Sequence, residues 1–219
     1  LDVTDKSNIT RIAEGGYPLQ KGTHQGWLSP DKRYFYIDDE LDENGVGAPP
    51  SLTRIMDVSD PYNPVFAGSF SSGRPSIDHN LYTKGDLIFE SNYRSGLRIF
   101  DASSPLAPFE VAYFDSFPDN DNPSYNGNWG NYPFFPSGTL IISDMERGLF
   151  VLRLTDFLSV TFPDGTPTQL LPGQLTTIFA RVREYGTTIA SGGVELRYRV
   201  NGGAYQSIPM NDAGAGQFQ

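Results

Sequence analysis

The sequence contains no cysteine among its 219 residues. Disulfide bonds, thiolate nucleophiles, zinc sites with cysteine ligands and c-type haem attachment are therefore excluded. Histidine is also scarce, since His24 and His79 are the only two. Chemistry that depends on cysteine thiolates is thus absent from this chain.

Basic residues are few relative to acidic ones: 16 lysines and arginines face 26 aspartates and glutamates, for a formal net charge of −10. A protein that binds nucleic acid needs a basic surface, so this class of function is excluded. The charge is compatible with cations and with neutral glycans as ligands. No apolar run approaches the ~20 residues of a membrane span, so we expect no transmembrane segment.

Glycine and proline are abundant, with 23 and 17 residues, and favour short strands and turns over long helices. One strand–turn–strand pattern, seen in residues 96–105, occurs several times. Its copies are anchored at positions 2, 57, 101 and 153, which lie 44 to 55 residues apart. A repeat of this period is typical of solenoids, propellers and arrays.

Each repeat divides into short strands separated by turns that contain glycine or proline. Four antiparallel strands per repeat predict a β-propeller blade, and residues 1–158 hold a little over three blades. Propellers have about four to eight blades, so we expect either a fragment or a ring that other material completes. The predicted strands are 24–28, 33–38, 53–57, 65–70, 79–83, 87–91, 97–101, 110–114, 132–135, 139–143 and 148–154.

The sequence pattern changes after residue 158, and residues 159–219 form a second predicted domain. Residues 175–183 and 194–200 alternate apolar and polar side chains, as half-buried strands do. Asn-Gly-Gly at 201–203 predicts a hairpin turn, with 204–210 as the returning strand. The predicted fold class is therefore all-β: a partial β-propeller with four-stranded antiparallel blades, followed by a partial immunoglobulin-like β-sandwich.

Several motifs carry a resemblance to a known family. Gly-Leu-Arg-Ile-Phe-Asp at 96–101 and its copies resemble the LVIVD repeat. Other stretches are similar to bacterial choice-of-anchor B proteins, namely residues 23–27, 38–43, 78–82 and 131–138. The resemblance covers about residues 1–154 and implies an exported β-propeller, extracellular or on the cell surface. The remainder resembles the immunoglobulin-like modules of secreted bacterial proteins.

His24 and His79 fall at the same point of two consecutive repeats, at the start of the first strand. The innermost strand of a blade lines the central channel, so the two imidazoles could bind a transition metal there, together with Asp78 or Asp38. The alternative is that each histidine forms a hydrogen bond to a turn and has an architectural role.

An acidic stretch follows the second predicted strand, with five carboxylates in residues 38–43. Calcium prefers such oxygen ligands, and we expect Asp38, Asp39, Glu40 and Asp42 to bind it if the stretch holds an ion. The spacing does not match an EF-hand loop, and a solvated acidic loop is the alternative.

A second oxygen-rich segment contains Asp119 and Asp121, followed by several asparagines. Alternating carboxylates lie on one side of an extended or turning loop, so calcium is again a candidate ligand. The alternative is a polar loop stabilised by its own Asx turns.

An aromatic group alternates with asparagine, glycine and proline between residues 125 and 135, and Trp129 and Tyr132 are its candidate ligand-binding members. Exposed rings could stack on sugars, whereas buried rings would pack between blades.

No Ser-His-Asp order and no G-x-S-x-G elbow occur, so the sequence supports no catalytic assignment. We expect a non-catalytic extracellular scaffold or binding module, with glycans or cell-surface proteins as partners. Two alternatives stay open. One is a carbohydrate-active enzyme that uses carboxylates of 38–43 and Asp78. The other is a structural subunit whose ring is completed by copies of itself or by other chains.

Overall fold

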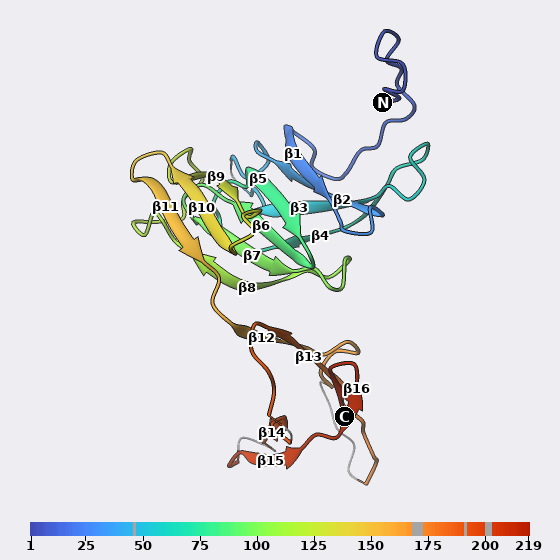
Figure 1. Ribbon diagram of the computed structural model, residues 1–219, viewed down its shortest axis with the longest axis vertical. Coiled ribbons are helices and arrows are strands. Elements are labelled where there is room, and N and C mark those ends of the chain that lie inside the picture. Colours follow the sequence, from blue (N-terminus) through green and yellow to red (C-terminus); the bar gives the residue numbers. More distant parts are fainter. Residues whose placement is uncertain (46, 168–172, 191, 200–202) are drawn as a thin grey trace. The chain divides into compact units, whose positions relative to one another are not determined.

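The computed structural model describes residues 1–45, 47–167, 173–190, 192–199 and 203–219. Its described residues form strands and turns, in two compact units, Leu1–Leu154 and Thr155–Gln219 (Figure 1). In this part of the chain, no helix is long and apolar enough to cross a membrane. The boundary expected after residue 158 falls inside β12 (Phe157–Thr161), which pairs with β13 (Ala180–Tyr185) of the second unit.

The first sheet of unit 1 contains β1 (Thr23–Leu28), β2 (Tyr34–Asp39), β3 (Leu52–Asp57) and β4 (Val65–Ser71). These strands lie in sequence order, and each neighbouring pair is antiparallel. The chain therefore folds as a meander, and residues 40–51, between β2 and β3, form its longest connection.

The second sheet repeats this arrangement with β5 (Asn80–Lys84), β6 (Leu87–Ser91), β7 (Leu97–Asp101) and β8 (Phe109–Phe114). Gly96 makes the turn before β7 possible, because its φ of 77° is in the left-handed region and a Cβ there would overlap the backbone at Phe114. Both four-stranded antiparallel sheets confirm the all-β prediction.

The third sheet has three strands, in the order β11 (Gly148–Arg153), β10 (Thr139–Asp144) and β9 (Asn128–Tyr132). The prediction of a strand at 132–135 was wrong, because β9 ends where Pro133 interrupts it. The polar sequence Asn-Trp-Gly-Asn at 128–131 lacks the apolar alternation that marks a strand.

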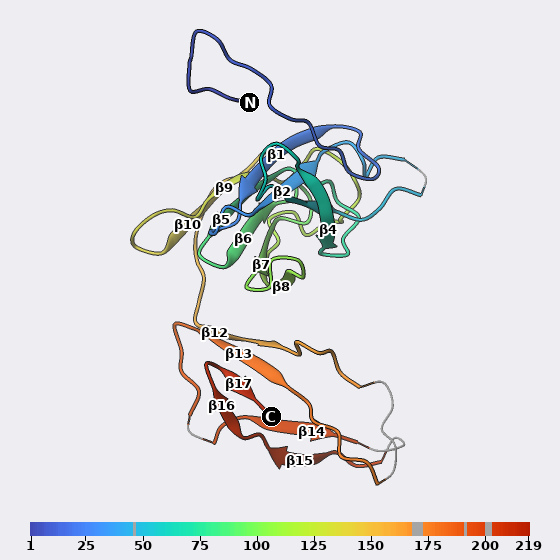
Figure 2. The ribbon, with the colours of Figure 1, turned by 90° about the vertical axis from the view of Figure 1, so that its right-hand side faces the viewer.

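The core of unit 1 lies between the first two sheets. Tyr36 and Ile55 from the first sheet are 0% exposed, as are Leu81, Ile88 and Phe100 from the second. Each sheet thus buries one apolar face on its neighbour, as sequence repeats of this kind require. β5 contacts both β1 and β9, so the first strands of the three sheets lie side by side (Figures 1 and 2).

Unit 2 contains the sheet β12-β13-β17-β16 and the hairpin β14 (Glu195–Tyr198) and β15 (Gln206–Pro209). The remaining strands are β16 (Asp212–Gly214) and β17 (Gln217–Phe218). The expected strand at 175–183 begins at Ala180, whereas 194–200 and 204–210 correspond to β14 and β15. The expected hairpin turn at 201–203 and the end of the strand at residue 200 lie largely outside the described residues.

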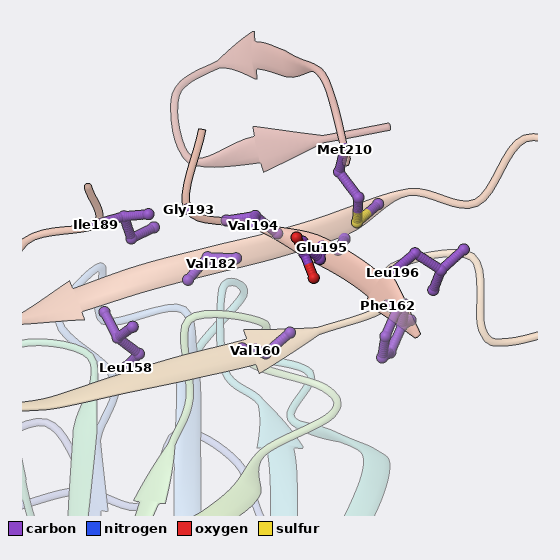
Figure 3. Close-up of a pocket in the computed structure, with 11 residues that line it drawn as sticks. Leu158, Val160, Phe162, Val182, Ile189, Gly193, Val194, Glu195, Leu196 and Met210 are labelled. Carbon is purple, nitrogen blue, oxygen red and sulfur yellow. The ribbon is translucent and has the colours of Figure 1, made fainter. Parts of the chain in front are cut away.

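The core of unit 2 is small. Ala180, Val182 and Phe218 are buried, and the side chains of Val160, Val182 and Met210 line an apolar pocket of about 230 Å³ (Figure 3). The described residues show two small sheets, and the immunoglobulin-like topology stays a prediction.

Candidate functional site

Five buried carboxylates come together in unit 1. Asp38 is in β2, Asp42 and Glu43 follow β2, Asp78 precedes β5, and Glu90 lies in β6. All five side chains are at most 2% exposed. We call this group the acidic cluster. Its members come from both of the first two sheets, so the packing of those sheets brings them together.

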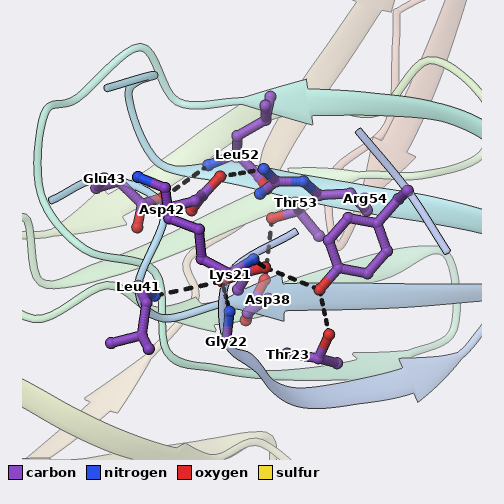
Figure 4. Close-up of polar contacts among 12 residues, drawn as sticks. Lys21, Gly22, Thr23, Asp38, Leu41, Asp42, Glu43, Leu52, Thr53 and Arg54 are labelled. Carbon is purple, nitrogen blue, oxygen red and sulfur yellow. Dashed lines mark hydrogen bonds and ion pairs between the residues drawn. The ribbon is translucent and has the colours of Figure 1, made fainter. Parts of the chain in front are cut away.

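Five of the ten oxygens of the acidic cluster have a hydrogen-bond donor, and Figure 4 shows the contacts of Asp38, Asp42 and Glu43. Asp42 Oδ2 pairs with the buried Arg54 guanidinium. Glu43 Oε1 accepts a bond from the backbone N–H of Leu52 at 3.2 Å. The Thr53 hydroxyl lies 3.2 Å from Asp38 Oδ1 and 2.8 Å from Glu90 Oε1, and its single hydrogen is donated to one of them at a time.

Five buried oxygens of this cluster have no hydrogen-bond partner among the described residues. They are both oxygens of Asp78, Oδ2 of Asp38, Oδ1 of Asp42 and Oε2 of Glu43. Native proteins seldom leave buried polar atoms unpaired, so each such atom needs an explanation. One oxygen from each of Asp42, Glu43 and Asp78 lies within 4.8 Å of the other two, which is the arrangement of ligands around a single cation.

Burial changes the protonation of the acidic cluster. Loss of water raises the pKa of Asp38 and Asp78 well above the usual range, and the neighbouring carboxylates add to the effect. Burial and the charge of Asp42 raise the pKa of Glu43 to about 9. For Glu90, burial raises the pKa to about 7. Without a cation, the cluster must therefore take up protons to relieve its charge.

Asp39, also a candidate calcium ligand, has a different environment. Its two oxygens accept bonds from the Tyr17 hydroxyl at 3.0 Å and from the backbone N–H groups of Lys21, Gly22 and Leu41 at 2.7, 2.5 and 3.4 Å. Four donors satisfy this carboxylate, so its role in the structure is to hold the chain before β1 against the end of β2.

Glu40, the remaining candidate of this stretch, points to the two histidines. Its Oε2 lies 3.4 Å from His24 Nδ1, and its Oε1 lies 2.8 Å from His79 Nδ1. The imidazole rings stack with centroids 4.4 Å apart. We call His24, Glu40 and His79 the histidine cluster. The structure thus brings the two histidines together, with Glu40 as their carboxylate in place of the expected Asp78 or Asp38.

The two aromatic candidates, Trp129 and Tyr132, pack in different groups of side chains. Trp129 packs edge-on against His79, with centroids 4.7 Å apart, and so adjoins the histidine cluster. Tyr132 packs against Phe134 and Phe135, at 5.4 and 4.9 Å, in another aromatic group. Burial of His79 lowers the pKa of its imidazole to about 4, despite the opposing charge of Glu40.

The segment with Asp119 and Asp121 does not form a group of close carboxylates. Among the described residues, two sets of three potential ligands lie close enough to share an ion, and neither contains these aspartates. Asp121 pairs with Arg74 at 3.2 Å, and the neighbouring Asn120 accepts a bond from Arg94. Arginine contacts therefore organise this loop.

A groove of about 540 Å³ lies beside Trp27, whose side chain is 40% exposed. It is lined by Gly26, Trp27, Leu28, Ser29, Pro30, Lys32, Phe35 and Thr83. The groove is mostly apolar, with two aromatic side chains, Trp27 and Phe35, and one cationic side chain, Lys32.

Sequence reasoning missed Arg54, Glu90 and Tyr93, and it included Glu43 in the acidic stretch without choosing it as a calcium ligand. Arg54 and Glu90 sit inside the otherwise apolar strands β3 and β6, and a charge within such a strand was the available signal. Tyr93 donates a hydrogen bond from its hydroxyl to Glu40 at 2.5 Å, a contact between distant residues that left no sequence signal.

No protein-family model matches the chain, and no curated protein is similar to it in sequence. Among solved structures, the crystal structure of Saccharomyces cerevisiae Sqt1 is similar over 78% of this chain and 45% of that chain. The TM-score is 0.43 and the sequence identity 5%. The chain thus corresponds to less than half of that structure.

Proposed function

We propose that this chain is a non-catalytic scaffold or binding module in which calcium, held by Asp42, Glu43 and Asp78, stabilises the first unit. Two observations carry the proposal: one oxygen from each of Asp42, Glu43 and Asp78 lies within 4.8 Å of the other two, and each of these residues has at least one buried oxygen without a hydrogen-bond donor among the described residues. Calcium binds oxygen ligands at about 2.3–2.6 Å, so two ligands on opposite sides of the ion are about 5 Å apart.

Charge supports a cation at this place. The five carboxylates of the acidic cluster are buried, and the buried Arg54 pairs with one of them, Asp42. A buried charge without a counter-charge costs several kcal/mol, and a divalent ion removes two such charges while supplying a partner for the bare oxygens. Magnesium fits less well, because it retains waters and requires near-ideal octahedral geometry.

Burial supports a structural role for this ion. Asp42 and Asp78 are 0% exposed and Glu43 is 2% exposed, so a substrate has no route to them. A glycoside hydrolase needs its two carboxylates on either side of a bound sugar. The carboxylates of the acidic cluster therefore favour a scaffold over the carbohydrate-active enzyme considered from the sequence.

Calcium titration calorimetry of the whole chain tests the proposal. We expect one site per chain, lost in Glu43→Gln. The substituted amide keeps the acceptor for the Leu52 N–H and replaces the oxygen without a partner. Asp119→Asn is the matched control, because this exposed aspartate lies outside the cluster. The proposal fails if wild type binds no calcium, or if the two variants bind it equally.

For the partner we propose a neutral glycan, bound in the groove beside Trp27. Exposed aromatic rings supply flat apolar faces for sugar rings, and Trp27 is held by an edge-on contact with Tyr82 at 5.0 Å. The acidic net charge of the chain does not oppose a neutral ligand. A glycan array with wild type and Trp27→Ala tests this partner, and equal binding patterns would refute the proposal that the glycan binds in the groove.

We further propose that the four-stranded sheets are blades of a β-propeller, in an exported protein of the cell surface. Their meander order, the side-by-side first strands and the face-to-face packing of the first two sheets support this. The immunoglobulin-like assignment of unit 2 belongs to the same proposal. An experimental structure of the whole chain tests the ring, and membrane fractionation of producing cells tests the location.

The alternative of a subunit completed by other chains has one observation in its favour. β11 lies at an edge of its sheet, and its Leu149 and Val151 side chains are 65% and 68% exposed. An exposed apolar edge strand favours pairing with another strand. Light scattering after gel filtration tests this, since a monomer at high concentration contradicts it.

A further inference from the structure

A second potential metal site differs from the acidic cluster in its chemistry. In the histidine cluster, one nitrogen each of His24 and His79 and one oxygen of Glu40 lie within 4.8 Å of one another. The three residues come from β1, from the segment after β2 and from the residue before β5. Two sheets therefore contribute to one constellation, and their packing fixes it.

His79 supplies an independent observation. The residue is 1% exposed, its Nδ1 lies 2.8 Å from Glu40 Oε1, and its Nε2 has no hydrogen-bond partner among the described residues. The neighbouring rings of Trp129 and Tyr93, each with its centroid 4.7 Å from that of His79, supply apolar contact. A buried imidazole normally uses its nitrogens, so its orientation toward Glu40 and His24 requires a reason.

The donor set selects the class of ion. Two imidazoles and one carboxylate are the ligands of many catalytic zinc sites and of non-haem iron sites. Calcium prefers oxygen ligands alone, so this cluster and the acidic cluster attract different cations.

A hydrogen bond orients the carboxylate. Tyr93 is 0% exposed, and its hydroxyl donates to Glu40 Oε1 at 2.5 Å. The Tyr93 ring is in turn held edge-on by Tyr125 and Trp129, with centroids at 5.3 and 5.8 Å. Such outer contacts fix the direction of a ligand and tune its affinity for a metal.

The cluster is open on one side. The His24 side chain is 38% exposed and that of Glu40 is 20% exposed, whereas that of His79 is 2% exposed. An ion at this place has its His79 side against protein and its His24 side toward water. Three protein ligands with a free position toward solvent distinguish exchangeable or reactive metal sites from closed structural ones.

We propose that His24, Glu40 and His79 bind a first-row transition-metal dication of the Zn²⁺ or Co²⁺ type, with a coordination position open to solvent. The histidine cluster and the acidic cluster share no ligand residue, so each site can be tested by substitutions of its own.

Co²⁺ titration of the whole chain, followed by visible absorption in calcium-containing buffer, tests the proposal. We expect one Co²⁺ per chain with the visible bands of a nitrogen–oxygen site, displaced by one equivalent of Zn²⁺. Substitution His24→Ala should weaken Co²⁺ binding at least 10-fold, and removal of the Tyr93 hydroxyl in Tyr93→Phe should weaken it on the order of 10–100-fold.

His24 is the half-exposed member of the cluster, so its substitution leaves the core intact, and circular dichroism verifies the fold. Asp119→Asn is the control: this exposed aspartate lies outside both clusters, so its substitution should leave the Co²⁺ affinity unchanged. If His24, Glu40 and His79 only form ion pairs with one another, Co²⁺ will not bind to the chain in a fixed ratio. That result, or equal affinities of wild type and His24→Ala, overturns the site without affecting the calcium proposal.

Discussion

Replacement of Asp78 by asparagine should have opposite consequences with and without calcium. The Asp78 side chain is completely buried, and neither oxygen has a hydrogen-bond partner in the described part of the chain. Asparagine has the same shape and no charge, and its amide can donate to a neighbouring carboxylate. In the presence of chelator, Asp78→Asn should therefore melt at or above the temperature of the wild type.

In the presence of calcium, the wild type should melt at a higher temperature than Asp78→Asn. A ligand at a hundred times its Kd stabilises the folded state by about 2.7 kcal/mol. For a domain of this size, each kcal/mol moves Tm by about 2–4 °C, so 1 mM calcium at a Kd of ~10 µM should raise the wild-type Tm by about 5–10 °C. The variant loses one of three ligands and should gain little.

Thermal unfolding followed by circular dichroism, at neutral pH with 1 mM chelator or 1 mM calcium chloride, measures both effects. Asp119→Asn makes the same chemical change at an exposed position and should behave as the wild type. The reasoning is refuted if Asp78→Asn keeps the full calcium-induced rise. It is equally refuted if the variant melts well below the wild type in chelator, because Asp78 would then have favourable partners.

Three further predictions concern stability in chelator, each measured by urea denaturation. Burial raises the pKa of Glu90 from 4.5 to about 7, so the folded state binds more protons than the unfolded chain between these values. The free energy of unfolding should therefore fall as the pH rises through this window, on the order of 3 kcal/mol, and a flat or rising profile would contradict this. Replacement Arg54→Met leaves the buried carboxylate of Asp42 unpaired and should lower the free energy of unfolding by about 3–5 kcal/mol. Arg11→Met removes an exposed ion pair and should lower it by less than ~1 kcal/mol. Equal losses in the two variants would argue against a buried pair. Gly96 and Gly138 both have a positive φ, but of the two only Gly96 has backbone atoms where an added Cβ would lie. Gly96→Ala should therefore lower the free energy of unfolding more than Gly138→Ala, and equal losses would rule out the overlap.

The repeat period predicted most of unit 1, because each strand pair is local and each turn is marked by glycine or proline. β6 and β7 begin and end at the predicted residues. β9 was misplaced because its residues are polar and its partner β10 supplies the pairing that the sequence does not signal. Local pattern reveals a strand only where one face is apolar.

The candidate sites were predictable in part for the same reason. Repeat equivalence placed His24 beside His79, since corresponding residues of neighbouring sheets lie side by side. The direction of Glu40 was not predictable, because the five acidic residues of 38–43 look alike in sequence. The turn after β2 sends their side chains to different surroundings. Asp39 meets backbone donors, Glu40 meets imidazoles and Asp42 meets Arg54.

The adjacency of Asp78 and His79 has a thermodynamic consequence. Successive residues of an extended chain point in opposite directions, so one peptide unit delivers a carboxylate to the acidic cluster and an imidazole to the histidine cluster. Any displacement of this peptide that improves the geometry around one ion alters the geometry around the other. If the two occupancies influence each other, the free energy of interaction has the same value in both directions, so zinc changes the affinity for calcium by the factor with which calcium changes that for zinc.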